Sequence, residues 1–532
     1  MRFVAFGVAL LALMVLSTIG RPHGGVAVAA GGSTLNRPED PVVLTGSDVP
    51  TLTGIAPHDL VAFRYDGGWT QIPVQVDERD SRTFTAVYNG VVTSSVTELF
   101  YTDPNTWVGA DSDPTFDATD EVAFMSKDAG GAAASFAPPP HTVAGSGVQA
   151  TITDPLAPSQ EGWVYLFHSD GSLDPAAGQS YVSYAFSLNS GNYKATYTLG
   201  DTHPALAGNP ENSTITTPNY SYHFGDRWQE DQMKISVGGS ANVNILDRHK
   251  PMFAPGNCGR TEDTFDGYID TLPIEGAFVA NKAGPVRAIR SFVGANSGPR
   301  TERDEIFYAQ RQDIRTELRV HAIPSIMDLF DYSPAASGMT YYNDLNTGGL
   351  TVDGVPDSAA LGQIHWQMVT GAQGTVVMSG AIATNIPGFT YTSYYEDNKV
   401  NPTTQCTGDA FAYGTSGVNI TGIPGGIPCT DPGLGCTAYL NSTSTLYYEP
   451  PSQAVAVAQA LDARANAPLA FNVQPLAASV GGIAEAPELA VTGPATAPGS
   501  GADAAAVLAG AIAGGLLVAG FGSRLLRRRR GS

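Results

Sequence analysis

Hydrophobic and polar residues alternate with a period of two along most of this chain of 532 residues. The alternating runs are short, rich in aromatic and β-branched residues, and bounded by Gly, Pro, Asn or Asp, which is typical of β-strands. Examples are Leu60–Tyr65, Trp69–Val76, Val148–Ile152, Trp163–His168, Val286–Val293 and Thr375–Ile382. Glu305–Ile323 predicts one long strand or two strands with a turn near Gln312, and the clearest helical period is Ser452–Ala465. The pattern predicts an all-β protein of stacked antiparallel sheets.

Composition divides the chain into three regions. The Ala/Gly/Pro-rich stretch Ala129–Pro140 closes a first region, residues 30–145, which we expect to form an antiparallel β-sandwich domain. Residues 146–474 then form a larger β-sandwich region, which is one domain or two. Residues 475–503 are rich in Pro, Ala, Gly and Ser, and this composition indicates a spacer.

Both ends of the chain carry targeting signals. Residues 1–29 combine Arg2, an apolar run and small residues before Ala30, which predicts a secretory signal peptide cleaved at that point. An uncleaved membrane anchor is the alternative. Residues 504–522 are uncharged and about as long as a transmembrane helix must be. The arginine-rich residues 523–532 that follow suit the cytoplasmic side of a membrane. We therefore expect an exported protein with one C-terminal transmembrane helix.

Leu489, Thr492 and Gly493 belong to a Leu-Ala-Val-Thr-Gly pentapeptide that precedes the apolar segment and the arginines. This order resembles the sorting signal of sortase-anchored bacterial surface proteins, which has an LPxTG motif or an LAxTG variant. Ala490 stands where proline is commoner. The resemblance implies cleavage between Thr492 and Gly493 and attachment to the cell wall, and a plain membrane anchor is the alternative. Both predict an extracellular protein anchored at the cell surface.

The charge balance is acidic, with 28 Lys and Arg against 50 Asp and Glu and a net charge of −22. This balance argues against nucleic acid as a partner, because phosphate binding needs a basic footprint. The basic residues concentrate between Arg227 and Arg319, where many alternate with apolar residues. They indicate one charged face of a sheet, which either pairs with acids of the same stretch or meets an acidic glycan.

The chain has four cysteines, which are Cys258, Cys406, Cys429 and Cys436. In an exported protein they are expected to form two disulfides, and three pairings remain open. The sequence contains no CxxC, HxH or HExxH pattern, which argues against a zinc site.

An acidic loop between residues 111 and 121 is a candidate calcium site. Its carboxylates alternate with other side chains, and hard cations such as Ca²⁺ prefer oxygen ligands of this kind. The candidate ligands are Asp111, Asp113, Asp117 and Asp120. The alternative is a turn-rich loop whose carboxylates accept hydrogen bonds from nearby backbone N–H groups.

Residues 222–231 place aromatic, basic and acidic side chains within ten positions. A saccharide site uses aromatic faces for stacking and polar groups for hydrogen bonds. The candidate catalytic residues are Tyr222, His223, Asp226 and Glu230, and the candidate ligand-binding residues are Arg227, Trp228, Arg248 and His249. The carboxylates suit hydrolysis and Tyr222 or His223 suits proton abstraction. The alternative is a structural segment with Trp228 in the core and Arg227 paired to an acid. The isolated His321 and His365 are interpreted as structural.

Two segments carry weaker resemblances. Gly284–Arg290 looks like a stretch of the galactose-mutarotase-like supersandwich domains found in polysaccharide lyases and glycoside hydrolases, which implies a carbohydrate ligand. No catalytic residue of those families maps onto this chain. Trp69–Glu78 together with Asp120–Met125 is similar to a module of exported bacterial proteins, and that similarity implies no activity.

These observations predict a bacterial cell-surface β-protein that binds a glycan or a partner, or serves as an envelope component. The alternative is a surface-anchored polysaccharide lyase or glycoside hydrolase that uses the Tyr222–Asp231 cluster. The sequence has no GxSxG elbow, Walker A motif or dinucleotide-binding fingerprint. Calcium is the one expected cofactor.

Overall fold

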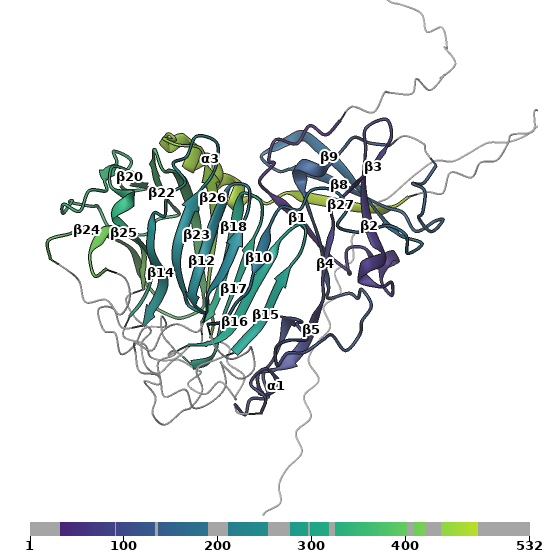
Figure 1. The fold of residues 1–532 in the computed structure, drawn as a ribbon, viewed down its shortest axis with the longest axis horizontal. Helices are drawn as coiled ribbons and strands as arrows, with labels where there is room; N and C mark the ends of the chain where they lie inside the picture. Colours follow the sequence, from purple (N-terminus) through teal and green to yellow (C-terminus); the bar gives the residue numbers. More distant parts are fainter. Residues whose placement is uncertain are drawn as a thin grey trace, which may run out of the picture. The chain divides into compact units, whose positions relative to one another are not determined.

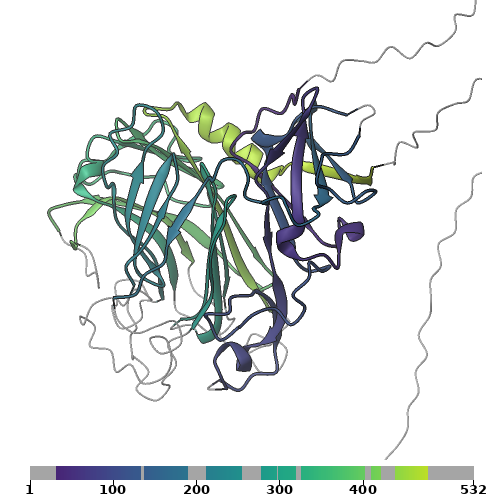
Figure 2. The same cartoon turned by 45° about the vertical axis from the view of Figure 1, so that its right-hand side comes forward.

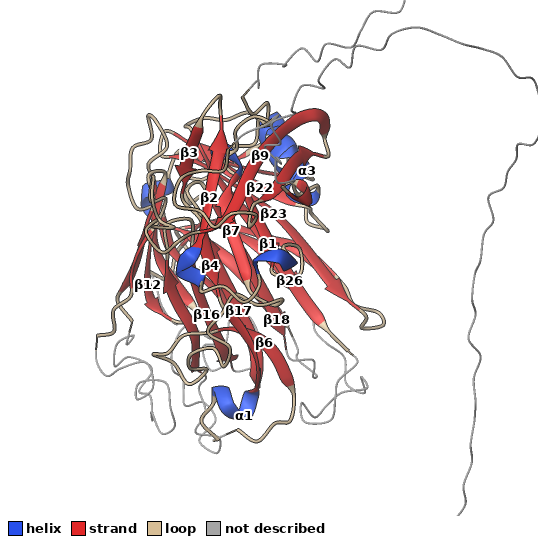
Figure 3. Cartoon of the chain, turned by 90° about the vertical axis from the view of Figure 1, so that its right-hand side faces the viewer, coloured by secondary structure: helices blue, strands red, loops and turns tan. Residues whose placement is uncertain are grey.

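Antiparallel strands make up about half of the chain that the structure describes and helices only a small part, which confirms the all-β prediction (Figure 3). The computed structural model describes residues 32–90, 92–133, 137–189, 211–253, 277–295, 298–318, 325–401, 409–420 and 438–476. All of them belong to the first of two compact units, Met1–Ser479 and Val480–Ser532. No described helix is long and apolar enough to cross a membrane, and the predicted span 504–522 lies outside the described residues.

The first strands form a small sandwich (Figure 1). One sheet has the order β27 (Ala470–Pro475), β8 (Val148–Asp154), β9 (Ala157–His168), β2 (Leu60–Tyr65), β3 (Trp69–Ile72). The facing sheet has the order β1 (Pro41–Thr45), β7 (Glu121–Met125), β4 (Gln75–Asp77). Inward residues such as Leu44, Leu60, Phe124 and Ile152 are fully buried between them. Alternation along each strand therefore builds the core that the sequence pattern predicts.

This sandwich does not end at residue 145, where the composition suggested a boundary. β8 and β9 follow that position, and β9 pairs with both β8 and β2 in the same sheet. β27 comes from the far end of the described chain and pairs with β8. A small hairpin, β5 (Arg79–Thr83) and β6 (Thr97–Tyr101), extends from the sandwich and is joined by the short helix α1 (Phe84–Val87).

The second sandwich stacks two large antiparallel sheets (Figures 1 and 2). The eight-stranded sheet runs β10 (Ser183–Ala185), β11 (Ser213–Thr216), β12 (Tyr220–Asp226), β13 (Gln229–Ile235), β14 (Leu246–Phe253), β19 (Ile326–Tyr332), β25 (Ala412–Ile420), β24 (Tyr391–Asn398). The nine-stranded sheet runs β15 (Ala277–Ala283), β16 (Ala288–Ala295), β17 (Gly298–Phe307), β18 (Arg311–Leu318), β26 (Leu440–Glu449), β23 (Gly374–Thr384), β22 (Trp366–Gly371), β20 (Thr340–Asn343), β21 (Leu350–Thr351). An aromatic core that includes Tyr220, Tyr222, Phe307 and Tyr448 lies between them.

Helix α3 (Val455–Asn466) coincides with the segment that showed a helical period. Its buried residues Ala458 and Leu461 pack on the outer side of the nine-stranded sheet, against Trp366 and Tyr447. Four short 3₁₀ turns complete the described structure, at Pro50–Leu52, Pro57–Asp59, Ser126–Asp128 and Pro334–Ala336. The Glu305–Ile323 segment forms two strands, because β17 ends at Phe307 and β18 begins at Arg311.

A buried polar contact joins the two sandwiches. Arg287, just before β16, donates from Nε to Asp77 at 2.8 Å and from Nη2 to Glu121 at 2.6 Å. Gln75 Oε1 accepts the backbone N–H groups of Val286 and Arg287 at 3.2 and 3.0 Å. The two segments that carried the weaker sequence resemblances are therefore in contact and joined by these hydrogen bonds.

Candidate functional site

Strand geometry separates the residues of the Tyr222–Asp231 cluster. The segment forms the hairpin of β12 and β13, and successive side chains of a strand point to opposite faces. Tyr222 points into the sandwich, where its hydroxyl lies 2.7 Å from that of Tyr448. His223 lies on the outer face. Asp226 is the last residue of β12. Tyr222 and His223 therefore do not converge on one site.

His223 is engaged on both ring nitrogens. Nδ1 lies 2.5 Å from Asp231 Oδ1, and Nε2 lies 2.7 Å from Asn212 Oδ1. The hydrogen bond to Asp231 raises the pKa of His223 above its usual value, against the opposing effect of burial. An imidazole held in this way has no bare nitrogen with which to accept a proton from a substrate.

Trp228 and Arg227 are both 2% exposed and offer no surface for a ligand to stack on. The indole Nε1 of Trp228 donates to the carbonyl of Gly294 at 2.8 Å, and its ring packs edge-on against Phe292. The carbonyl oxygen of Arg227 accepts a hydrogen bond from Arg290. The placement of Trp228 in the core matches the structural alternative of the sequence analysis.

Glu230 and His249 belong to a buried chain of charges between the sheets. His249 Nδ1 lies 2.8 Å from Glu230 Oε2, and Nε2 lies 2.8 Å from Asp328 Oδ1. Arg303, on the facing sheet, donates to the other oxygen of Asp328 at 2.6 Å. The His249 ring stacks on Phe330 with a centroid separation of 3.8 Å. The chain of charges therefore links both sheets through side chains from β13, β14, β17 and β19.

The electrostatics of this chain favour a fixed ion-pair network. Burial lowers the pKa of His249, but the carboxylates of Glu230 and Asp328 outweigh it and raise the value to about 9. Burial raises the pKa of Asp328, but Arg303 and then His249 outweigh it and hold the value well below its usual range. His249 is thus a charged imidazolium with both N–H groups donated, which is a structural state and not that of a general base. Arg248 lies apart from it and pairs with Asp331 at 2.9 Å.

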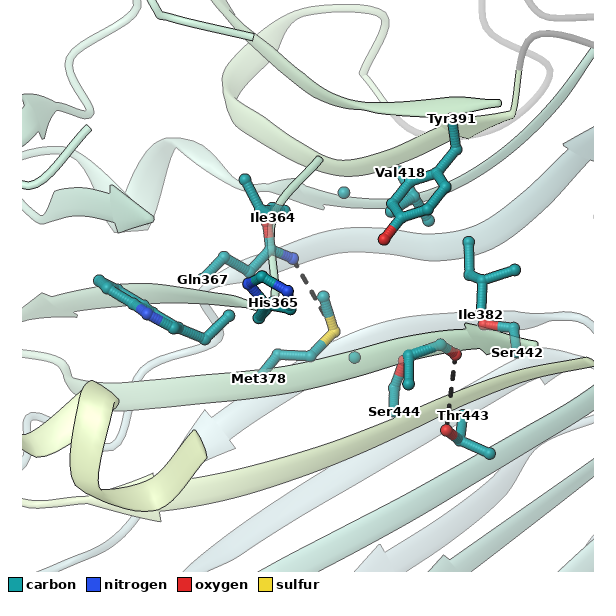
Figure 4. A pocket seen from close by; sticks show the side chains of 14 residues that line it. Ile364, His365, Gln367, Met378, Ile382, Tyr391, Val418, Ser442, Thr443 and Ser444 are labelled. Carbon is teal, nitrogen blue, oxygen red and sulfur yellow. Dashed lines mark hydrogen bonds between the residues drawn. The ribbon is translucent and has the colours of Figure 1, made fainter. Parts of the chain in front are cut away.

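An open slot lies further along the same inter-sheet space, where β22, β23 and β26 face β24 and β25 (Figure 4). The cavity itself measures about 30 Å³, and the whole space between its walls, including the part open to solvent, is about 400 Å³. Met378, Ile382, Ser442 and Ser444 come from the nine-stranded sheet, and Tyr391 comes from the opposite sheet. The slot lies beside the buried charges. In the pairing of β26 with β18, Ser442 is opposite Thr316, and the Thr316 hydroxyl accepts a hydrogen bond from Nε of Arg303.

The slot combines apolar walls with unused hydroxyl groups. Within the described residues, the hydroxyls of Tyr391, Ser442 and Ser444 make no hydrogen bond to protein. None of the residues that line the slot is Asp, Glu, Lys or Arg. Few polar groups on an apolar surface are the usual lining of a small-molecule site. Sequence reasoning missed these residues, although alternate serines along one strand are a signal for a row of hydroxyls on one face.

The carboxylates of the acidic loop are used locally. Asp111 accepts the backbone N–H of Asp113, Asp113 accepts that of Thr115, and Asp117 accepts that of Thr119. Asp120 accepts the N–H groups of Asp117 and Arg79. These are the turn contacts of the alternative interpretation. Among the described residues, no group of three or more His, Cys, Asp or Glu side chains is arranged to hold a metal ion. The calcium site stays a prediction.

Several predicted features fall outside the described residues. They are the signal peptide, the four cysteines Cys258, Cys406, Cys429 and Cys436, the sorting residues Leu489, Thr492 and Gly493, His321, and the apolar segment 504–522. The predictions of two disulfides and of cell-surface anchoring therefore stay predictions.

No protein-family model and no curated protein sequence matches the chain. Among solved structures, the chain is weakly similar to a putative aldose 1-epimerase from Escherichia coli K12. The TM-score is 0.24, with 11% identity over 44% of this chain and 96% of that chain. It is also weakly similar to a family GH92 α-mannosidase from Bacteroides thetaiotaomicron. That TM-score is 0.25, with 9% identity over 54% of this chain and 32% of that chain. Similarities this weak carry no argument about function.

Proposed function

We propose that the chain is an exported, C-terminally anchored bacterial cell-surface protein that binds a neutral saccharide in the inter-sheet slot. The observation that carries the binding proposal is the set of three hydroxyls, from Tyr391, Ser442 and Ser444, that have no protein partner within the described residues and line one slot. The predicted signal peptide and the C-terminal sorting signal support the proposal of surface anchoring.

The chemistry of the slot favours a neutral polyhydroxylated ligand over a charged one. Pyranose rings present apolar C–H groups, which match Met378, Ile382 and Val418, and hydroxyls that can both donate and accept. A charged ligand would leave water without a counter-charge, which is unfavourable where the lining carries no Asp, Glu, Lys or Arg.

Binding is favoured over turnover because the acid–base groups between the sheets are already committed. Both nitrogens of His249 are held by carboxylates, and the Asp328 carboxylate is held by His249 and Arg303. A general acid or base needs a free position within hydrogen-bonding reach of the substrate. The network is therefore better suited to hold the two sheets together than to transfer a proton to a ligand.

The test is calorimetric titration of the secreted chain with neutral oligosaccharides that differ in sugar and linkage. At least one should bind, and Tyr391→Ala should weaken that binding by about tenfold or more, since it removes both the wall and a hydroxyl. Tyr394→Ala is the matched control, because Tyr394 is the same residue type on the opposite face of β24 and bonds to Glu396. Equal loss in both variants, or no binding by any sugar, would contradict the proposal. New reducing ends in the same mixtures would identify an enzyme instead.

A further inference from the structure

A second cavity lies on the outer face of the eight-stranded sheet, over β11, β12 and β13. It measures about 300 Å³, which is large enough for a small ligand. The inward residues of these strands, such as Tyr222 and Met233, belong to the aromatic core of the sandwich. The residues that alternate with them therefore point outward into the cavity.

Register arranges the outward side chains in two rows across the three strands. The rows are Thr216, Ser221 and Lys234, and Thr214, His223 and Gln232. Neighbouring strands lie about 4.8 Å apart, and residues two positions apart along a strand lie about 7 Å apart. The outer face thus presents a grid of polar groups with the spacing of the substituents on a sugar ring.

The polar groups of the first row are not used within the part of the protein that the structure describes. There, the side chains of Thr216, Ser221 and Lys234 make no hydrogen bond or ion pair. His223 differs, because Asp231 and Asn212 hold both of its ring nitrogens. The first row therefore offers two hydroxyls and one ammonium group to a ligand.

The turn after β13 adds a further donor to the cavity. An isolated β-bridge between Lys234 and Asn244 brings this turn back to the lysine. Asn242, in the turn, lines the cavity and has a φ of 52°, which asparagine adopts more readily than most residues. Ser236 donates to Asn242 Oδ1 at 3.2 Å, so the amide Nδ2 is left to donate to a ligand.

Charge complementarity indicates what kind of ligand fits. No Asp or Glu is among the described residues that line the cavity, although the whole chain has a net charge of −22. Arg290 and Arg303, from the same basic stretch of the sequence, are buried and paired with acids. Lys234 instead points outward among hydroxyl and amide groups. This setting suits an anionic group on a ligand that also carries hydroxyls, because a charge-assisted hydrogen bond is stronger than a neutral one.

We propose that this cavity binds an acidic sugar, with the anionic group on Lys234 and ring hydroxyls on Ser221 and Thr216. A carboxylate and a sulfate offer the same chemistry to an ammonium group, and the experiment below distinguishes them. The inference goes beyond the proposed function and does not depend on it, because the cavity and the inter-sheet slot share no residue.

The experiment is calorimetric titration of the full secreted chain with oligouronides, their uncharged methyl esters, and sulfated oligosaccharides of neutral sugars. We expect one acidic class to bind, and which class binds identifies the anionic group. Lys234→Gln keeps a polar side chain but removes the charge, and it should weaken this binding by about tenfold or more. Lys399→Gln is the matched control, because it removes the same charge from a lysine that donates to the Asp353 carbonyl and does not line the cavity.

Two further variants place the ligand on the sheet. Ser221→Ala should weaken binding of the acidic sugar by about threefold or more, since it removes one neutral hydrogen bond. Tyr391→Ala, which alters the inter-sheet slot, should leave that binding unchanged. Equal weakening by Lys234→Gln and Lys399→Gln would reveal only a long-range effect of charge and would overturn the inference, as would weakening by Tyr391→Ala alone. Failure of every acidic ligand to bind would also overturn it, while leaving intact the proposed function, which concerns neutral sugars.

Discussion

The contact between Gly284 and Gln75 gives a sharp test of how the two sandwiches are joined. A Cβ on Gly284 would lie 2.1 Å from Gln75 Oε1, so Gly284→Ala must displace the glutamine side chain. That oxygen accepts the N–H groups of Val286 and Arg287, and the amide nitrogen donates to Asp77 at 3.0 Å. Displacement leaves two buried N–H groups without a partner, at about 1–2 kcal/mol each. We expect Gly284→Ala to lower the free energy of unfolding by about 2–4 kcal/mol.

A double-mutant cycle distinguishes this mechanism from a general effect of alanine. Gln75→Ala removes the same hydrogen bonds and also the atom that a Cβ would strike. In that background Gly284→Ala should cost less than about 1 kcal/mol, which gives a coupling of roughly 2 kcal/mol. Urea unfolding of the four proteins measures the coupling, and Gly68→Ala serves as a control because its Cβ would meet nothing within 4 Å. Additive costs in the cycle would refute the reasoning.

Three other predictions concern pH, the buried charges and anchoring. Burial raises the pKa values of Glu305 and Glu449 to about 7, from about 4.3 in the unfolded chain, so their contribution to stability is lost as pH rises between those values. His249 has a folded pKa of about 9, so its contribution to stability is lost between about pH 6.5 and 9. The urea midpoint should therefore be highest near pH 5 and fall steadily to pH 9. His249→Leu should lower the free energy of unfolding by about 3–5 kcal/mol at pH 6, measured by the same titration, because the buried Glu230 loses its counter-charge and Asp328 keeps only Arg303; a loss below 1 kcal/mol would contradict the ion-pair chain. If the sorting signal acts as the resemblance implies, mass spectrometry of wall-released protein should find Thr492 at its C-terminus, and Thr492→Ala should leave the protein in the membrane fraction.

Period-two alternation was enough to predict the class of fold, because it depends only on local geometry. The strands predicted at Leu60–Tyr65 and Val148–Ile152 lie within β2 and β8. Alternation does not say which strand pairs with which. The pairing of β27 with β8 joins segments about 320 residues apart and has no local signature. A boundary drawn from composition at residue 145 therefore separates β9 from its partner β2.

The candidate site was harder to predict, because a cluster in sequence is not a cluster in space. Tyr222 and His223 are neighbours in sequence but lie on opposite faces of β12. Register shifts on either side of Phe224 further disturb the period, so simple alternation does not give the faces of this hairpin. The candidates Glu230 and His249 lie in one ion-pair network, but the residues that complete it, Asp328 and Arg303, come from strands that the sequence does not connect to them.

The arginines between residues 227 and 319 do not line the slot, which is why it carries no arginine charge. Alternation indicated one charged face of a sheet, but it does not say whether that face is inside or outside. Arg290 and Arg303 point into the sandwich, at 0% and 1% exposed, and they pair with Glu211, Glu305 and Asp328. Buried charges are costly unless each has a partner, so these groups satisfy one another and are not available to a ligand. The inter-sheet space is therefore divided into a charged part that is closed and a slot that holds unused hydroxyls.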